Sequence, residues 1–312
     1  MDAGAITISR DVLAAKSKSF AMAAKLLPAS CRDAIAVVYA WCRRVDDAID
    51  LAPQHERPLA LARLQTELDC VYAGKPVNDP VVDAFAEVVR AFRIPRHYPE
   101  ELVEGMAMDV ARTRYATIDE LLLYCYRVAG VVGLMLCHVM GVTDPRALRN
   151  AAHLGIAMQL TNVCRDVDED LRDGRLYLPI DSAADRLEGR ECRRATCTPA
   201  DRPTMIRTVE RLLDEADRYY RSADRGLLAL SFRCALSVRA ARLVYSAIGA
   251  RLRRRRCDPF GHRAHVSTFA KLVLVFFAFV LSVLELPRRI VRRRRPTAPD
   301  RVLGFPNDVI PV

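Results

Sequence analysis

The chain has 312 residues, of which 51% are hydrophobic and 28% are charged, and its net charge is +10. This balance excludes an intrinsically disordered protein, and the length is enough for one large domain or two small ones. Glycine is sparse at 13 residues while Ala, Leu, Val and Arg abound, which favours an all-helical protein.

Hydrophobic residues recur with helical spacing along most of the chain, and prolines mark the breaks. The pattern predicts helices at 10–26, 30–50, 56–73, 80–93, 97–112, 118–141, 145–171, 201–227, 232–256 and 265–286. Residues 172–200 are expected to be mostly irregular. No alternating strand pattern and no repeat of 20–50 residues occurs. We therefore expect one all-helical domain over residues 1–286 and a basic, proline-containing tail over residues 287–312.

Sequence signals of several other protein classes are missing. The chain has no Walker A sequence and no GxGxxG after a strand, so a nucleotide cradle is not indicated. Its ten cysteines include no CxxC pair, which favours reduced thiols in a cytoplasmic protein over a zinc site. The N-terminus lacks the basic and apolar regions of a secretory signal.

The positive charge is concentrated near the C-terminus, in RLRRRR (251–256) and RRIVRRRR (288–295). Such clusters attract nucleic acid or an anionic membrane surface, and the alternative is a solvated helix end followed by a tail. No interleaved aromatic residues or recognised motif supports nucleic-acid binding. Between the clusters, residues 272–284 are nearly all apolar but fall short of the roughly 20 residues that span a bilayer. They predict a buried or interfacial helix.

Acidic and amide side chains line one face of the predicted helix 145–171, within the segment QLTNVCRDVDED (159–170). With spacings of 3, 4 and 4 residues, the members of this stripe are Gln159, Asn162, Asp166 and Asp170. Polar residues also occupy the other side of the helix, among them Arg165 and Asp168. One polar face must therefore point inward, where carboxylates without a compensating charge are costly.

The segment YAWCRRVDDAID (39–50) repeats this arrangement with Tyr39, Arg43, Asp46 and Asp50 on one stripe. Carboxylates four residues apart destabilise a helix unless a positive charge lies between them. Either stripe alone fits an ordinary solvated face, but two of them together favour a shared cation. Mg²⁺ prefers such oxygen ligands and completes its shell with water and phosphate; Mn²⁺ is the alternative. The pattern indicates a diphosphate with an apolar tail, bound between helices.

Six segments carry a resemblance to a known family. In chain order they are SKSF (17–20), YAWCRRVDDAID (39–50), YCYRVAGVVG (124–133), QLTNVCRDVDED (159–170), GRLYLP (174–179) and CDPFGHRAHVSTFAKL (257–272). Together they resemble the squalene/phytoene synthase family, most closely its bacterial phytoene synthases, over about residues 12–285. The resemblance implies an isoprenoid synthase helical bundle with a central apolar cavity. It also implies the head-to-head condensation of two geranylgeranyl diphosphates to 15-cis-phytoene, via prephytoene diphosphate.

Residue roles follow from the same resemblance. The implied Mg²⁺ ligands are Asp46, Asp50, Asn162, Asp166 and Asp170, and the four aspartates count with Tyr39 and Tyr177 as catalytic. The implied substrate-binding residues are Ser19, Phe20, Arg43, Gln159, Asn162, Arg165, Tyr245 and Lys271. Arg165 owes its role to the resemblance alone, since it lies off the acidic stripe. Lys16 and His265 depart from residues that are common in relatives, and either could alter a diphosphate contact.

Other functions within and outside the family stay open at this point. A squalene-type or hydroxysqualene-type synthase would use farnesyl diphosphate, and squalene formation needs NADPH. No dinucleotide fingerprint is present, so NADPH is not expected. A non-catalytic assembly protein with this fold is a further alternative. The arginine clusters and the last apolar helix predict a cytoplasmic protein at the inner face of the cell membrane, with downstream carotenoid enzymes as further candidate partners.

Overall fold

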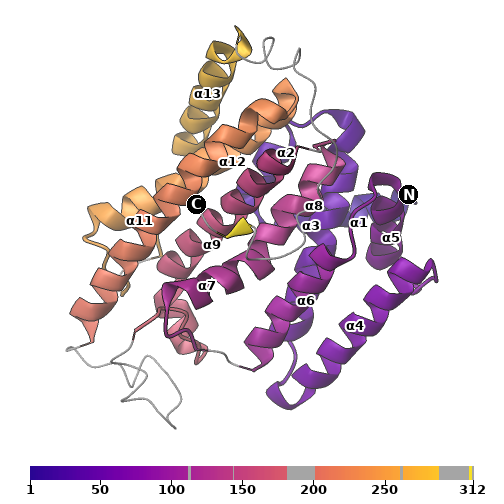
Figure 1. Cartoon of the computed structure of the whole chain (residues 1–312), viewed down its shortest axis with the longest axis horizontal. Coiled ribbons are helices and arrows are strands. Elements are labelled where there is room, and N and C mark those ends of the chain that lie inside the picture. The colour runs from indigo at the N-terminus through magenta and orange to yellow at the C-terminus, as the bar shows by residue number, and fades with distance from the viewer. Residues whose placement is uncertain (112–113, 143, 181–200, 261–262, 288–308, 311–312) are drawn as a thin grey trace.

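The computed structural model describes residues 1–111, 114–142, 144–180, 201–260, 263–287 and 309–310. Every regular element within these ranges is helical, which confirms the all-α prediction (Figure 1). The α-helices are α1 (Ala3–Lys16), α2 (Lys18–Ala24), α3 (Ala29–Asp50), α4 (Arg57–Ala73), α5 (Pro80–Phe92), α6 (His97–Val110), α7 (Ile118–Cys125), α8 (Val131–Val139), α9 (Pro145–Arg172), α11 (Arg202–Gly226), α12 (Phe232–Arg254) and α13 (Thr268–Leu284). Short turns of helix occur at Gln54–Glu56 and Leu227–Ala229.

Local sequence explains how these helices begin and which face they bury. In α5, Asp79 is the N-cap, and its carboxylate accepts hydrogen bonds from the backbone amides of Val81 and Val82. Pro80 occupies the first turn, where a missing amide hydrogen costs nothing. Phe85, on the apolar face, stacks on Trp41 of α3 with ring centroids 4.1 Å apart. Helix propensity, capping and side-chain packing therefore all favour a helix at these residues.

The N-terminal helix prediction was wrong in its extent. The structure has two helices in place of one at 10–26, and the first begins at Ala3 with Asp2 as its N-cap. The break is at Ser17, whose backbone is extended and whose hydroxyl accepts a hydrogen bond from the amide of Phe20 at 3.2 Å. Ser17 therefore ends α1 and caps α2, which turns the chain toward the centre of the bundle.

The predicted helix at 118–141 is interrupted by a π-helical turn at Tyr126–Gly130. Residues Ile118–Val139 are long and apolar enough to cross a membrane, but 56% of their most apolar window is buried within the protein. This segment therefore forms part of the protein core. The turn lies against α9 so closely that a β-carbon at Gly155 would be 2.2 Å from the carbonyl oxygen of Ala129. Only glycine allows this approach.

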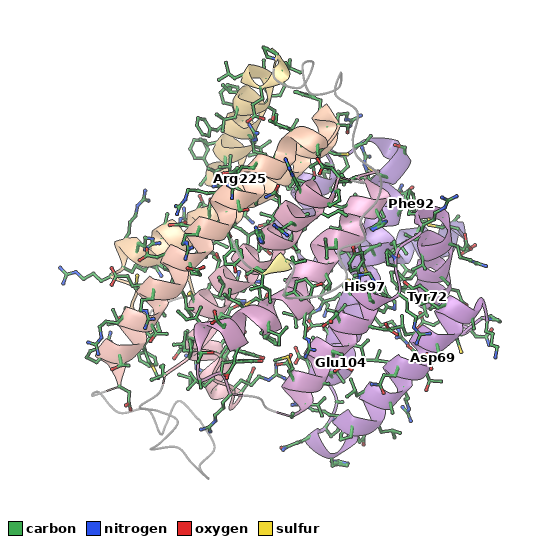
Figure 2. All side chains as sticks on the ribbon, viewed as in Figure 1. Asp69, Tyr72, Phe92, His97, Glu104 and Arg225 are labelled. Carbon is green, nitrogen blue, oxygen red and sulfur yellow. The ribbon has the colours of Figure 1, made fainter. Side chains whose placement is uncertain are left out.

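The helices at the margin of the bundle are joined by polar contacts. Arg96 bridges α4 and α6, with guanidinium nitrogens 2.6 Å from Asp69 and 2.5 Å from Glu100. Tyr72 donates a hydrogen bond to the carbonyl of Ile94 at 3.0 Å. Figure 2 shows Asp69 and Tyr72 at this rim, far from α13, which lies at the opposite margin of the view.

Two residues of the segment expected to be a tail are packed against the body of the protein. Val309 is fully buried, and its carbonyl oxygen accepts a hydrogen bond from His153 Nε2 at 2.6 Å. Tyr219 donates to the carbonyl of Ile310 at 2.7 Å. Because Nε2 donates, Nδ1 of His153 accepts from the hydroxyl of Ser222 at 2.7 Å. The imidazole is thus held neutral.

This buried histidine predicts a pH-dependent stability. Burial lowers the pKa of His153 from 6.5 to about 4, so the unfolded chain binds the proton first as the pH falls. The stability that neutral His153 provides is complete above pH 6.5 and is lost on acidification toward pH 4, amounting to about 2 kcal/mol by pH 5. Urea unfolding at pH 7.5 and 5 should show this loss, and His153→Gln should lack it. His55→Gln, at an exposed site, is the control; equal pH slopes in all three proteins would contradict the prediction.

Candidate active site

A cavity of about 340 Å³ lies at the centre of the bundle, between α2, α3, α6, α8, α9 and α12. Its walls are largely apolar, and they include Leu102, Met106, Val132, Leu136 and Met158. At one end the lining becomes polar, with Arg43 and Asp46 from α3 facing Gln159 and Asn162 from α9. The predicted central apolar cavity is therefore present, and both acidic stripes reach its mouth.

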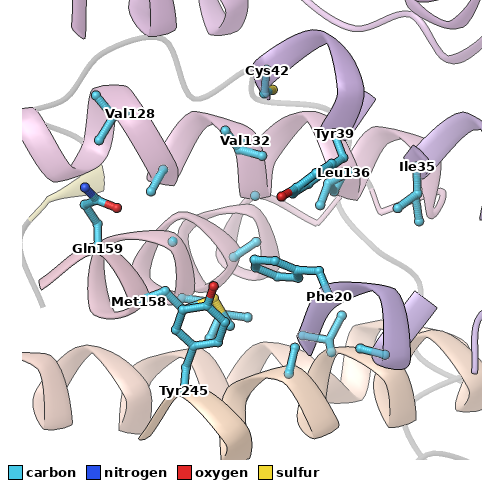
Figure 3. Close-up of a pocket in the computed structure, with 18 of the residues that line it drawn as sticks. Phe20, Ile35, Tyr39, Cys42, Val128, Val132, Leu136, Met158, Gln159 and Tyr245 are labelled. Carbon is cyan, nitrogen blue, oxygen red and sulfur yellow. The ribbon is translucent and has the colours of Figure 1, made fainter. Parts of the chain in front are cut away.

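Three aromatic rings gather between the polar end and the apolar walls (Figure 3). Phe20 lies between Tyr39 and Tyr245, with ring centroids 6.0 and 5.3 Å apart. Ser17, the N-cap of α2, lies near both tyrosines, and burial raises the pKa of Tyr39 to about 12. These rings are therefore neutral faces that can stabilise a nearby cation.

On α3, the first acidic stripe is held in a network of ion pairs. Arg43 Nη1 lies 2.6 Å from Asp46 Oδ2, and the same guanidinium pairs with Asp47. Lys16 Nζ lies 2.9 Å from Asp47 Oδ2. Burial, and then the charge of Asp50, raises the pKa of Asp46 to about 6. Asp47, which the helical wheel leaves off the stripe, thus helps to fix Arg43.

On α9, the second stripe is arranged in a similar way. Asn162 donates to Gln159 Oε1 at 3.2 Å, while its own Oδ1 is buried without a hydrogen-bond partner. Asp166 is paired with Arg165, whose Nε lies 2.7 Å from Oδ1, and with Arg263 at 2.9 Å. Burial, and then the charge of Asp166, raises the pKa of Asp170 to about 8. Arg165 therefore lies beside the acids although the wheel places it off their stripe.

Asp109 and Arg175 join the two stripes, and neither was among the predicted site residues. Tyr177 donates to Asp109 at 2.7 Å and Tyr124 donates to its other oxygen at 3.1 Å. Arg175 Nη2 lies 2.6 Å from Asp50 Oδ1. Arg175 is part of the GRLYLP segment, so this motif could have identified it as a site residue. No sequence signal marked Asp109, because no other acid lies three or four residues from it in its helix.

Two predicted residues lie away from this cluster. Ser19 is on α2 but does not line the cavity, and Ser17 is the serine that lies near Tyr39. Lys271 is on α13 beside Lys18; burial and that neighbouring charge lower the pKa of Lys271. Asp168, left out on the wheel, pairs with Arg172 of its own helix.

The donor atoms fit a cation that is shared with a substrate. In the part of the chain that the structure describes, no three His, Cys, Asp or Glu side chains are close enough to hold a metal ion by themselves. However, Asn162 Oδ1 is buried without a hydrogen-bond partner, and burial and mutual repulsion within the pairs Asp46–Asp50 and Asp166–Asp170 raise the pKa values of Asp46 and Asp170 in spite of the neighbouring arginines. Mg²⁺ typically uses one or two carboxylates and completes its shell with substrate phosphates. The residues therefore fit such an ion.

Comparison with known proteins identifies relatives over nearly the whole chain. The profile described as squalene/phytoene synthase matches residues 13–270. A phytoene synthase of Rhodobacter capsulatus is 38% identical over 294 residues, which cover 93% of this chain and 86% of the relative. A 15-cis-phytoene synthase of a Paracoccus species is 41% identical, covering 86% of this chain and 89% of the relative. Among solved structures, a dehydrosqualene synthase in complex with ligand has a TM-score of 0.76 at 28% identity, covering 90% of this chain and 97% of that one.

Proposed function

The chain belongs to the squalene/phytoene synthase family and is a prenyltransferase-type enzyme, and on this premise we propose its reaction and substrate. It condenses two molecules of geranylgeranyl diphosphate head to head, and the product is 15-cis-phytoene formed by way of prephytoene diphosphate. One observation carries this assignment in the structure: an apolar cavity whose mouth is lined by two facing acidic stripes and by arginines. Such a site matches a diphosphate joined to a long hydrocarbon tail.

We propose Mg²⁺, or Mn²⁺ in its place, as the cofactor, held by Asp46, Asp50, Asn162, Asp166 and Asp170. When bound, the ion would neutralise the charge that grows on the departing diphosphate. The arginines of the mouth supply the remaining positive charge. Arg43, Arg165 and Arg263 now pair with carboxylates, and their planar guanidinium groups also suit phosphate oxygens.

The apolar part of the cavity protects the allylic cation that remains after diphosphate departs. Most of its walls are apolar. Burial raises the pKa values of Tyr39 and Tyr245 in the aromatic cluster and of the nearby Cys42 thiol, which keeps all three groups protonated. The double bond of the second substrate then attacks the cation and a proton is lost, which gives the cyclopropylcarbinyl diphosphate. A second ionisation, rearrangement and proton loss give the hydrocarbon. Excluding water prevents capture of either cation as an alcohol.

The assignment is tested by incubating the purified chain with geranylgeranyl diphosphate and Mg²⁺ and identifying the hydrocarbons by mass spectrometry. We expect phytoene without added NADPH. Farnesyl diphosphate, with and without NADPH, is the parallel substrate. Consumption of the C15 substrate alone would assign the chain to the squalene-type branch instead, and turnover of neither would favour a non-catalytic assembly role.

We also propose that the protein is cytoplasmic and binds peripherally to the inner face of the cell membrane, where downstream carotenoid enzymes would find the product. The support is the apolar surface of α13 next to the exposed arginines at the end of α12. Cell fractionation should recover the protein with membranes and release it at high salt. Complete recovery in the soluble fraction at low salt would refute this location.

A further inference from the structure

The outer face of α13 is apolar and exposed along its whole length. Phe269, Phe276 and Leu284 expose 76%, 68% and 69% of their surface, and further exposed members are Leu272, Val273, Phe277, Phe279 and Val283. No charged residue occurs between Lys271 and Glu285. A contiguous apolar surface of this kind marks a site of contact with a partner or a membrane.

Length and charge identify the partner of this face as an anionic lipid bilayer. A helix of 17 residues is about 26 Å long, which is shorter than the roughly 30 Å hydrocarbon core. Moreover, α13 stays packed along α12, with Ala278 buried against Leu236 and Ala240, so it would lie in the plane of the interface. Arg254 and Arg256 are exposed at the neighbouring end of α12, where they can meet anionic headgroups.

The apolar end of the cavity lies just beneath this face. One side of α12 contacts α13 through Leu236 and Ala240, while Val238 and Ala241 line the cavity. The chain at the end of α2 is divided in the same way: Leu26 packs with the α13 cluster, whereas Leu27 lines the cavity. A single layer, made of α2 and α12, therefore separates the cavity from the membrane-facing surface.

At the apolar end of the cavity, polar contacts to backbone carbonyls close the seam between the end of α2 and α12. Ser237 donates a hydrogen bond to the carbonyl of Ala23 at 2.8 Å. Arg233 donates to the carbonyls of Leu26 and Leu27 at 3.2 and 3.1 Å. The aromatic contact between Phe20 of α2 and Tyr245 of α12 lies toward the first residues of α2. The end of this seven-residue helix can therefore move away from α12 while those rings stay in place.

We propose that the hydrocarbon product leaves the cavity through the seam between α2 and α12, directly into a bilayer that α13 has entered. This inference rests on the proposed function, because it requires an apolar product. The alternative route, through the mouth, would move the hydrocarbon past carboxylates and arginines into water, which is unfavourable for every methylene group that becomes exposed. Substrate enters by its diphosphate at the polar mouth, and product leaves at the apolar end.

The test measures how fast phytoene moves from the full-length protein to vesicles that contain phosphatidylglycerol. A single turnover without vesicles loads the protein with product, and vesicles are then added and separated by flotation. Phe276→Glu places a charge on the α13 face. It should leave the single turnover unchanged, abolish flotation and slow the transfer at least about tenfold, because a carboxylate on the apolar face opposes insertion of that face among the acyl chains. Leu59→Glu, at an exposed apolar residue of α4, is the matched control and should behave like the unmodified chain.

A second pair of variants tests the seam separately from membrane binding. Arg233→Ala removes two hydrogen bonds across the seam and should speed the transfer about tenfold while flotation stays the same. Arg233→Gln keeps one donor and should be intermediate, and thermal unfolding confirms that both variants are folded. Unchanged transfer in Arg233→Ala, or normal transfer in Phe276→Glu, would overturn the proposal. Absence of phytoene after the single turnover would refute the proposed function instead.

Discussion

Replacing Asp170 with asparagine is expected to lower kcat/KM for geranylgeranyl diphosphate about a thousandfold, which is the scale of losing one electrostatic contact to the departing group. Asp170 is half-buried next to Asp166, and its partial burial, and then the charge of Asp166, raise its pKa to about 8. A carboxylate in that position is stabilised only when a cation joins the pair. Asparagine fills the same space but supplies no charge. Steady-state kinetics over a range of Mg²⁺ concentrations would measure the loss.

The matched control is Asp173→Asn, which removes the same charge from an exposed residue at the end of the same helix. It should retain nearly full activity. The two variants should also differ in thermal unfolding without substrate or metal, because only Asp170→Asn removes a half-buried carboxyl group that is crowded by Asp166. We expect its Tm to rise while that of Asp173→Asn stays the same. Activity within tenfold of the unmodified chain in Asp170→Asn would contradict the role of Asp170.

The second large effect concerns stability and follows from adding one methyl group to α9. In Gly155→Ala the new β-carbon would lie 2.2 Å from the carbonyl oxygen of Ala129 and 2.8 Å from the α-carbon of Gly130. Both atoms belong to backbone, so neither can swing aside, and α9 must separate from the π turn. We expect the free energy of unfolding to fall by about 3 kcal/mol or more, at the upper end for overpacked cores. Urea unfolding followed by circular dichroism measures the change.

Gly249→Ala serves as the comparison, since it adds the same methyl group to another buried helical glycine. Its β-carbon would lie 3.2 Å from the end of the Leu213 side chain, which can rotate, and alanine favours the helix by about 1 kcal/mol. This variant should be as stable as the unmodified chain or slightly more so. Equal stability of the two variants would show that the close approach at Gly155 is unimportant.

Much of the site could be predicted because each acidic stripe is contained in one helix. The spacing of Asp166 and Asp170, or of Asp46 and Asp50, is visible in the sequence, and so is the need for a cation between them. The helical wheel did not predict that Asp47 and Arg165 belong to the site. Their side chains form ion pairs with residues of the stripes although their own positions lie off the stripes. Asp109 could not be found in this way, because its role depends on Tyr124 and Tyr177, which arrive from two other segments.

The limits of the fold prediction have the same origin. Helical periodicity located the long helices to within a few residues, but it carried no information on the extended backbone at Ser17, which depends on a single hydroxyl. Nor did the composition of the last residues indicate that Val309 would be buried. Its place depends on His153, more than 150 residues earlier in the chain. Local patterns predict elements well, whereas contacts between distant segments need the assembled structure.

The π turn allows a single helical stretch to present side chains to two different chemical environments. One additional residue in a helix turns everything after it by about 100° relative to what precedes it. Tyr124, before the turn, can therefore point at Asp109, while Val132 and Gly133, after it, line the apolar cavity. Deleting one residue between 126 and 130 would restore a regular helix and rotate one of these two sets out of place. The π turn thus fixes the rotation about the helix axis between the residues that face charged groups and the residues that face hydrocarbon.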